Sequence, residues 1–136
     1  MSWNKNDLIP ETEITEKVTD VTVQFAKRFG DYLALKEPEA DPLTTSQLRK
    51  FFGEVKRQQM TGYNETNFVM LKPKLAYAVG RAKSGKRKYA KIEDFYTVLA
   101  DAIDKVGRSQ DKQKAFKNFI TVFEAIVAYH KAAEKK

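Results

Sequence analysis

The chain has 136 residues, 42% of them hydrophobic, and a formal net charge of +7, which indicates one domain with one apolar core. It contains no cysteine, so disulfides, thiolate metal sites and cysteine nucleophiles are excluded, and a reducing cytoplasm is the expected compartment. No apolar run approaches the roughly 20 residues of a membrane-spanning helix, and the first residues are too polar for a signal peptide, so we expect a soluble protein.

The charge is unevenly divided along the chain. Residues 1 to 45 hold nine acidic and five basic residues, net −4, whereas residues 46 to 136 hold nine acidic and twenty basic residues, net +11. Within a single expected domain, residues 1–136, we therefore distinguish an acidic N-terminal helix with its linker, 1–43, from a basic helical region, 44–136.

The first periodic segment runs from about Thr12 to Leu35, where apolar residues recur at intervals of three and four. This spacing predicts one amphipathic helix, with Gly30 as the position where it could break. The following segment, Lys36 to Leu43, contains Pro38 and Pro42, and proline disfavours a helical conformation in the residue before it. We therefore predict a non-helical linker.

A second helix is expected to begin after Thr44, because the Thr44 hydroxyl and the Gln47 side chain form the pattern of a capping box. A third helical region, from about Glu65 to Ala82, contains Pro73, which removes a backbone donor. The proline predicts either a kink or a new helix with Pro73 at its first position. The predicted core stripe of the second helix is Leu48, Phe51, Phe52 and Val55.

Beyond a basic loop, Lys83 to Tyr89, a fourth helix is predicted from Ile92 to an end at Gly107, and Ser109 is expected to cap a fifth. The fifth helix has large apolar residues on one face, which we assign to the core. Its opposite face is small, which predicts the close approach of another helix. The small face consists of Thr121, Ala125, Ala128 and Ala132.

Five helical segments without a strand-like alternation predict an all-α, single-domain bundle of about five helices. The apolar stripes of these helices define its core. The predicted core residues include Phe25, Phe52, Leu75, Phe95, Leu99, Phe116, Phe123 and Val127.

The sequence supplies little for catalysis, and we expect no enzyme, no metal and no cofactor. The single histidine, His130, has no second histidine with which to share a metal, and we interpret it as a residue at the core boundary. No P-loop or dinucleotide fingerprint surrounds the glycines. Four carboxylates of the fourth helix are predicted on its outer side, in solvent or in a subunit contact. They are Glu93, Asp94, Asp101 and Asp104.

A strongly basic window is the main functional signal. From Thr66 to Ile92 the chain has no Asp or Glu in 27 residues, but eight Lys and Arg. Because no nearby carboxylate cancels their field, and aromatic residues lie among them, the window suits contacts with nucleic acid. The alternative is a solvated helix face and a lysine-rich loop that keep the protein soluble.

The basic residues take definite positions on the predicted helices. On the second helix, Arg49 and Lys56 flank the core stripe. Lys50 and Arg57 point away from the stripe, and Gly53 lies between the two pairs, where a phosphate could approach the backbone closely. This arrangement favours contacts with the nucleic acid backbone.

On the third helix, Lys74 and Arg81 share one face with Tyr77 beside them. Cation, ring and cation suit a nucleic acid strand, although Tyr77 could equally belong to the core boundary. No helix-turn-helix, zinc-finger or homeodomain pattern is present, so we expect sequence-tolerant binding to the backbone. The candidate RNA-binding residues are Arg49, Lys50, Lys56, Arg57, Lys72, Lys74, Arg81, Lys83 and Arg87.

Three segments, in order along the chain, carry a resemblance to a known family. They are LTTSQLRKFFGEVKR at 43–57, LKPKLAYAVGRAK at 71–83 and FITVFEAIVAYHK at 119–131. Together they resemble the small subunit of type III-A CRISPR effector complexes, the Csm small subunit. The similarity extends from about residue 43 to the end and leaves the acidic first helix as a variable part.

The resemblance implies a helical-bundle subunit without catalytic activity, present in several copies beside other subunits of a ribonucleoprotein for antiviral defence. It implies guide RNA and single-stranded target RNA as partners, bound independently of sequence. The residues alone leave open a protein-interaction module, or a general nucleic-acid-binding helical domain unrelated to CRISPR. The family's RNA-facing basic positions correspond most directly to Arg49, Lys50, Arg57, Lys72, Lys74 and Arg81.

Overall fold

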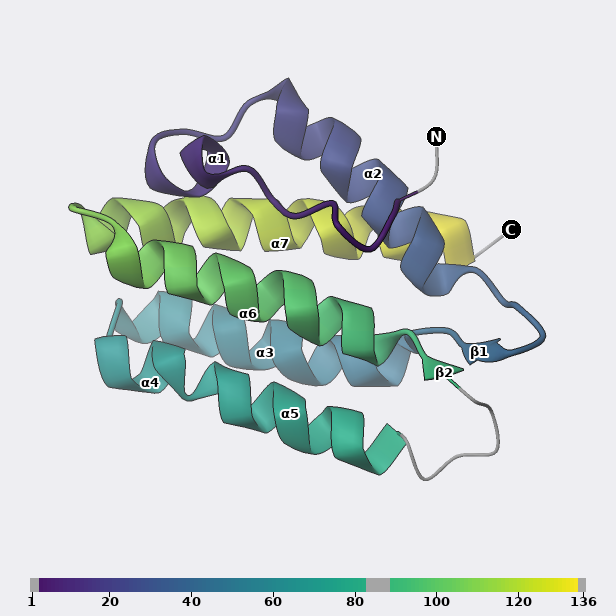
Figure 1. The fold of residues 1–136 in the computed structure, drawn as a ribbon. Coiled ribbons are helices and arrows are strands. Elements are labelled where there is room, and N and C mark those ends of the chain that lie inside the picture. Colours follow the sequence, from purple (N-terminus) through teal and green to yellow (C-terminus); the bar gives the residue numbers. More distant parts are fainter. Residues whose placement is uncertain (1–2, 83–88, 135–136) are drawn as a thin grey trace.

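The computed structural model describes residues 3–82 and 89–134, and in that part of the chain it contains seven α-helices and two strands of two residues each (Figure 1). The predicted all-α bundle is confirmed. The helices are α1 (Glu11–Thr15), α2 (Asp20–Ala34), α3 (Thr45–Thr61), α4 (Glu65–Val69), α5 (Leu71–Ala82), α6 (Ile92–Arg108) and α7 (Lys112–Glu134). The strands are β1 (Ala40–Asp41) and β2 (Tyr89–Ala90), which pair in parallel.

The longest helix, α7, organises the bundle. It contacts α1, α2, α3 and α6, and Figure 1 shows it between α2 on one side and α6 and α3 on the other. The outer helix α5 packs against α6. The acidic N-terminal helices therefore lie on the opposite side of α7 from α3 and α5.

The single first helix expected from Thr12 to Leu35 is wrong, because α1 ends at Thr15 and α2 begins at Asp20. The Glu13 carboxylate accepts hydrogen bonds from the backbone and hydroxyl groups of Thr19, at 2.8 and 2.7 Å, and of Thr22, at 3.0 and 2.6 Å. Burial raises the pKa of Glu13, but these hydrogen bonds outweigh burial and hold the pKa below its usual value. The chain therefore folds back so that Glu13 satisfies the open N-terminus of α2.

Gly30 does not break the helix but lies buried within α2, against α7. Within the chain, the helix that approaches α7 closely is α2, through its own small residues, Ala26 and Gly30. The predicted approach of another helix to the small-residue face of α7 is not tested within one chain and stays a prediction. On α7, Thr121, Ala128 and Ala132 are exposed and Ala125 is half-buried.

The capping box of α3 is confirmed. The Thr44 hydroxyl accepts from the Gln47 backbone at 3.1 Å, and the Gln47 side chain accepts from the Thr44 backbone at 2.8 Å. In the third region the helix is interrupted at Met70, so Pro73 is the third residue of α5 rather than its first. Pro73 therefore lies in the first turn of α5, where its missing donor would have no partner within the helix.

The ends of the last two helices differ from the predictions. Gly107 is inside α6, which ends at Arg108, and Ser109 follows as its C-terminal cap. The side chain of Asp111, not Ser109, accepts from the backbone of Lys114 at 3.0 Å and so caps the start of α7. Serine and aspartate are both favoured as N-terminal helix caps. Residue type alone therefore could not decide between Ser109 and Asp111.

The predicted core is confirmed in the main. Six of the eight named residues are buried, whereas Phe52 and Val127 are half-buried and pack against the core. Trp3, which was not predicted, is also buried, with its ring centroid 4.8 Å from that of Phe29 and 4.9 Å from that of Tyr32. The N-terminal segment therefore covers one end of α2.

Asp94 and His130 are more buried than the sequence suggested. Asp94 is only 6% exposed, rather than on the outer side of its helix, and accepts a hydrogen bond of 2.6 Å from the Tyr32 hydroxyl. His130 is 1% exposed, with Nε2 at 2.7 Å from the Leu43 carbonyl oxygen, rather than at the core boundary. Burial, followed by the hydrogen bond to Asp94, raises the pKa of Tyr32. The other three carboxylates of α6 are exposed or half-buried.

Candidate nucleic-acid interface

Two helices, α3 and α5, run antiparallel. Four of the candidate cations lie on the faces that these two helices turn toward each other. A face of α3 that includes Lys50 and Arg57 looks toward α5, and a face of α5 that includes Lys74 and Arg81 looks back. We call the surface formed by these four residues the α3–α5 seam. The seam contains two hollows, one near each end.

The first hollow is a cavity of about 300 Å³ between the start of α3 and the end of α5. Lys50 and Arg81 line it from the two helices, and Phe51 contributes an apolar wall. None of the described residues that line it is acidic. They are Ser46, Gln47, Lys50, Phe51, Ala78, Arg81 and Ala82. Two cations thus meet across an indentation whose described lining holds no carboxylate, which suits a phosphate group.

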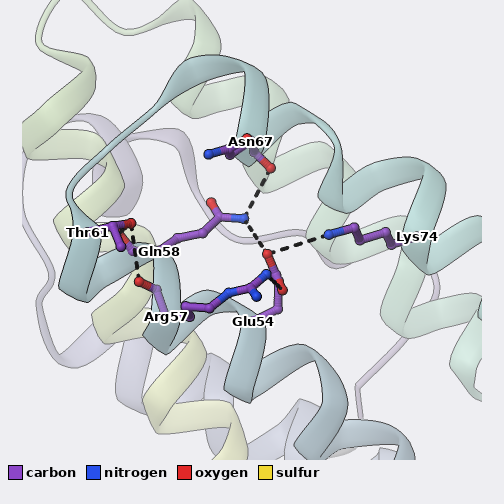
Figure 2. Close-up of polar contacts among 6 residues, drawn as sticks. All are labelled: Glu54, Arg57, Gln58, Thr61, Asn67 and Lys74. Carbon is purple, nitrogen blue, oxygen red and sulfur yellow. Dashed lines mark hydrogen bonds and ion pairs between the residues drawn. The ribbon is translucent and has the colours of Figure 1, made fainter.

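The second hollow, a cavity of about 230 Å³, lies between the end of α3 and the α4–α5 junction and does contain a carboxylate. Figure 2 shows Arg57 and Lys74 directed at Glu54 from α3 and α5. The Lys74 nitrogen is 3.5 Å from a Glu54 oxygen, and Arg57 forms an ion pair with Glu54 one helical turn away. Gln58 Nε2 donates to Glu54 and to the Asn67 carbonyl oxygen, both at 3.1 Å.

These contacts strongly stabilise the charged form of Glu54. The hydrogen bond from Arg57, then that from Gln58 and the charge of Lys74, lower the pKa of Glu54 to about 2, against the opposing effect of partial burial. Glu54 is therefore ionised near neutral pH. In the free chain it balances part of the charge that Arg57 and Lys74 would offer to a ligand.

Arg49 and Lys56 lie on the other flank of α3, toward α7. The Lys56 nitrogen is 2.8 Å from a Glu124 oxygen of α7, and Arg49 lines an apolar hollow of about 170 Å³ together with the half-buried Phe52. Gly53 is exposed on the ridge between the two flanks, and no atom lies within 4 Å of the place a Cβ would take. The ridge is open, as the sequence predicted.

Not all candidates join this surface. Lys72 points to the other side of α5, where its nitrogen is 2.7 Å from Asp104 Oδ1 of α6. Lys83 and Arg87 lie outside the described residues. Tyr77 is 70% exposed on α5 and so does not belong to the core boundary. Its ring is accessible on the helix that carries Lys74 and Arg81.

Sequence analysis missed Glu54, although the signal was present. Glu54 follows Lys50 by four residues and precedes Arg57 by three, so it shares a helical face with both. The partner on α5, Lys74, could not be found from spacing because the distance between two helices depends on their packing. The structure brings Lys50, Arg57, Lys74 and Arg81 together and separates Arg49, Lys56 and Lys72 from them.

The described residues contain no group of three or more His, Asp or Glu arranged to hold a metal ion. None of the helices in the described part of the chain is long and apolar enough to cross a membrane.

Comparison with known proteins supplies one result. A family model described as Csm2 Type III-A matches residues 16–136. No curated protein and no solved structure matches the chain. The match includes every helix from α2 to α7 and therefore both sides of the α3–α5 seam.

Proposed function

The chain belongs to the Csm2 family and is thus a subunit of a type III-A CRISPR complex. We propose that it is a non-catalytic subunit that binds the sugar-phosphate backbone of RNA. The partners are the guide RNA and the single-stranded target RNA. Binding is independent of sequence, because lysine and arginine side chains on this surface meet phosphates, which carry no sequence information.

One observation carries the proposal. Lys50 and Arg81 meet from two helices across a hollow whose described lining contains no carboxylate. On a surface kept basic for solubility alone, cations have no reason to converge on one indentation. The exposed Tyr77 ring, on the helix that carries Arg81, supplies a stacking surface for a base near the phosphate contacts.

The other parts of the proposal follow from membership in a large assembly. The subunit works in the cytoplasm, in several copies beside other subunits, as part of antiviral defence. Its remaining candidate cations, Arg49, Lys56, Lys72, Lys83 and Arg87, serve as further contacts with RNA. Lys56, which pairs with Glu124, and Lys72, which pairs with Asp104, would exchange or share those carboxylates.

The test is the affinity of the full chain for single-stranded RNA, measured by fluorescence anisotropy over a series of salt concentrations. The Lys50→Ala, Arg81→Ala variant should bind more weakly, and the slope of log affinity against log salt should become shallower by roughly 0.7 for each phosphate that is no longer neutralised. The control is Lys114→Ala, Lys117→Ala, which removes the same charge from exposed positions on α7. Equal effects of the two pairs would show that only net charge matters and would contradict the assigned surface.

A further inference from the structure

We propose that the second hollow of the α3–α5 seam is a binding site for an RNA backbone phosphate, that the Glu54 carboxylate occupies it in the free chain, and that RNA displaces Glu54. This inference rests on the proposed RNA-binding function and adds a competitor to it. Glu54 would then weaken RNA binding without itself touching the RNA, by holding Arg57 and Lys74 until a phosphate replaces it.

The geometry around Glu54 is that of an anion site already filled. The Glu54 side chain is 18% exposed and accepts from Arg57 and Gln58 of α3, with Lys74 of α5 at 3.5 Å. The oxygens of a phosphodiester accept hydrogen bonds from the same donors. The two cations remain open to solvent, with 67% of the Arg57 side chain and 52% of the Lys74 side chain exposed. A strand can therefore reach both from outside.

The contacts of Glu54 are also of a kind that can be exchanged. Ion pairs whose cations are this exposed contribute little net stability. Within the described chain, Gln58 Oε1 is buried and has no hydrogen-bond partner, because the Gln58 amide is turned so that its nitrogen serves Glu54 and Asn67. A buried acceptor without a donor costs free energy. The hydrogen-bond network around Glu54 is therefore incomplete. Release of Glu54 does not break a network in which every polar group has a partner.

The two hollows of the seam differ in whether a carboxylate is among their described lining residues. Lys50 and Arg81 face a hollow without a carboxylate in its described lining, whereas Arg57 and Lys74 face one that contains Glu54. A strand that follows the seam would therefore meet the competing carboxylate where it reaches Arg57 and Lys74, and Glu54 lowers affinity there.

Displacement of Glu54 should make the affinity for RNA depend on pH. The charged groups that face Glu54 are Arg57 on its own helix and Lys74 on α5, while Asn67 of α4 acts only through Gln58. With these partners the pKa of Glu54 is about 2, and without them it should return toward 4.5. A pKa that rises on binding means proton uptake, so affinity should increase as pH falls through about 4.5, by about fourfold at pH 4.

The experiment compares the parent chain with Glu54→Gln, using labelled oligouridylate because uracil takes up no proton between pH 6 and 4. The new amide oxygen can still accept from Arg57, and the side chain keeps its size, so the fold should be kept, as circular dichroism would verify. At pH 7 this variant should bind on the order of tenfold more tightly, since two ion pairs no longer compete. It should lack the gain in affinity that the parent shows at pH 4. The control Glu16→Gln makes the same change of charge at an exposed position between α1 and α2.

The outcomes are separable. If Glu54→Gln and the parent bind equally, or if Glu16→Gln gives the same gain, the displacement is wrong. It is also wrong if the gain persists when Arg57 and Lys74 are replaced with alanine in the Glu54→Gln background. If Lys50→Ala, Arg81→Ala weakens binding while Glu54→Gln changes nothing, the proposed function stands and only this inference fails. If neither the parent nor any variant binds oligouridylate, both fail.

Discussion

Gly30 of α2 lies so close to α7 that a Cβ atom on it would be 2.7 Å from the backbone nitrogen of His130. In an exposed helix position, Gly→Ala stabilises by up to about 1 kcal/mol. Here the clash is with backbone, which cannot turn aside. We predict that Gly30→Ala destabilises by about 1 to 3 kcal/mol, measured by urea denaturation.

Two other helical glycines provide the control for this prediction. Gly53 of α3 and Gly80 of α5 have no atom within 4 Å of the place a Cβ would take, and neither has a positive φ. Alanine at either position should leave stability unchanged or raise it by up to about 1 kcal/mol. A Gly30→Ala protein as stable as these would show that α2 and α7 are not packed this closely.

Phe123 of α7 lies at the centre of an aromatic cluster. Its ring centroid is 5.8 Å from that of Phe52, 5.9 Å from that of Phe95 and 6.1 Å from that of Phe119. Phe123→Ala should cost on the order of 3 to 5 kcal/mol in unfolding free energy. Tyr77→Ala, at an exposed ring, should change stability by less than about 0.5 kcal/mol. Similar losses for both would contradict the assigned core.

The Glu13 carboxylate should make stability depend on pH in the acid range. Its pKa in the folded chain is below the usual 4.5, so its contribution is present above that value and is lost as pH falls through the folded pKa. At pH 7, Glu13→Gln should lose roughly 1 to 3 kcal/mol, because an amide cannot accept from both Thr19 and Thr22 as a carboxylate does. Thermal melts from pH 7 to pH 3 should show the two proteins converging. A constant difference would mean that Glu13 does not cap α2.

Lys91 is fully buried and closes the C-terminal end of α2. Its nitrogen donates to the carbonyl oxygens of Tyr32, at 2.8 Å, and Leu35, at 2.9 Å, and pairs with Glu37. Lys91→Met keeps the length of the side chain but removes the donor to both carbonyl oxygens and the partner of Glu37, so it should cost roughly 1 to 3 kcal/mol. Hydrogen exchange should speed up at the Leu43 amide, which bonds to Leu33 near the same end of α2. Unchanged exchange and stability would argue against this role.

The sequence predicted most of the fold because local signals and packing agree in this chain. The capping box at Thr44 and the apolar stripe of α6 were each sufficient to place a helix. Errors arose where a contact distant along the chain decided the outcome. The break before α2 depends on Glu13, which faces Thr22 only after the chain has turned back. The burial of Asp94 depends on Tyr32, 62 positions earlier.

The candidate site follows the same rule. Spacing along α3 separated Lys50 and Arg57 from Arg49 and Lys56, and the structure places the two pairs on opposite flanks of that helix. Spacing could not show that Lys74 shares a carboxylate with Arg57, or that Lys72 turns away to Asp104. Both depend on how α5 packs against its neighbours. Whether these residues bind RNA remains a prediction.

The most direct test of the central claim is to map where RNA lies on this chain within its assembled complex. The complex, with guide and target RNA bound, would be irradiated with ultraviolet light, and the peptides cross-linked to RNA would be identified by mass spectrometry. We predict cross-links in α3 and α5, with Tyr77 among the modified residues. Cross-links confined to α1 and α2, or an absence of cross-links to this chain, would contradict RNA binding at the α3–α5 seam.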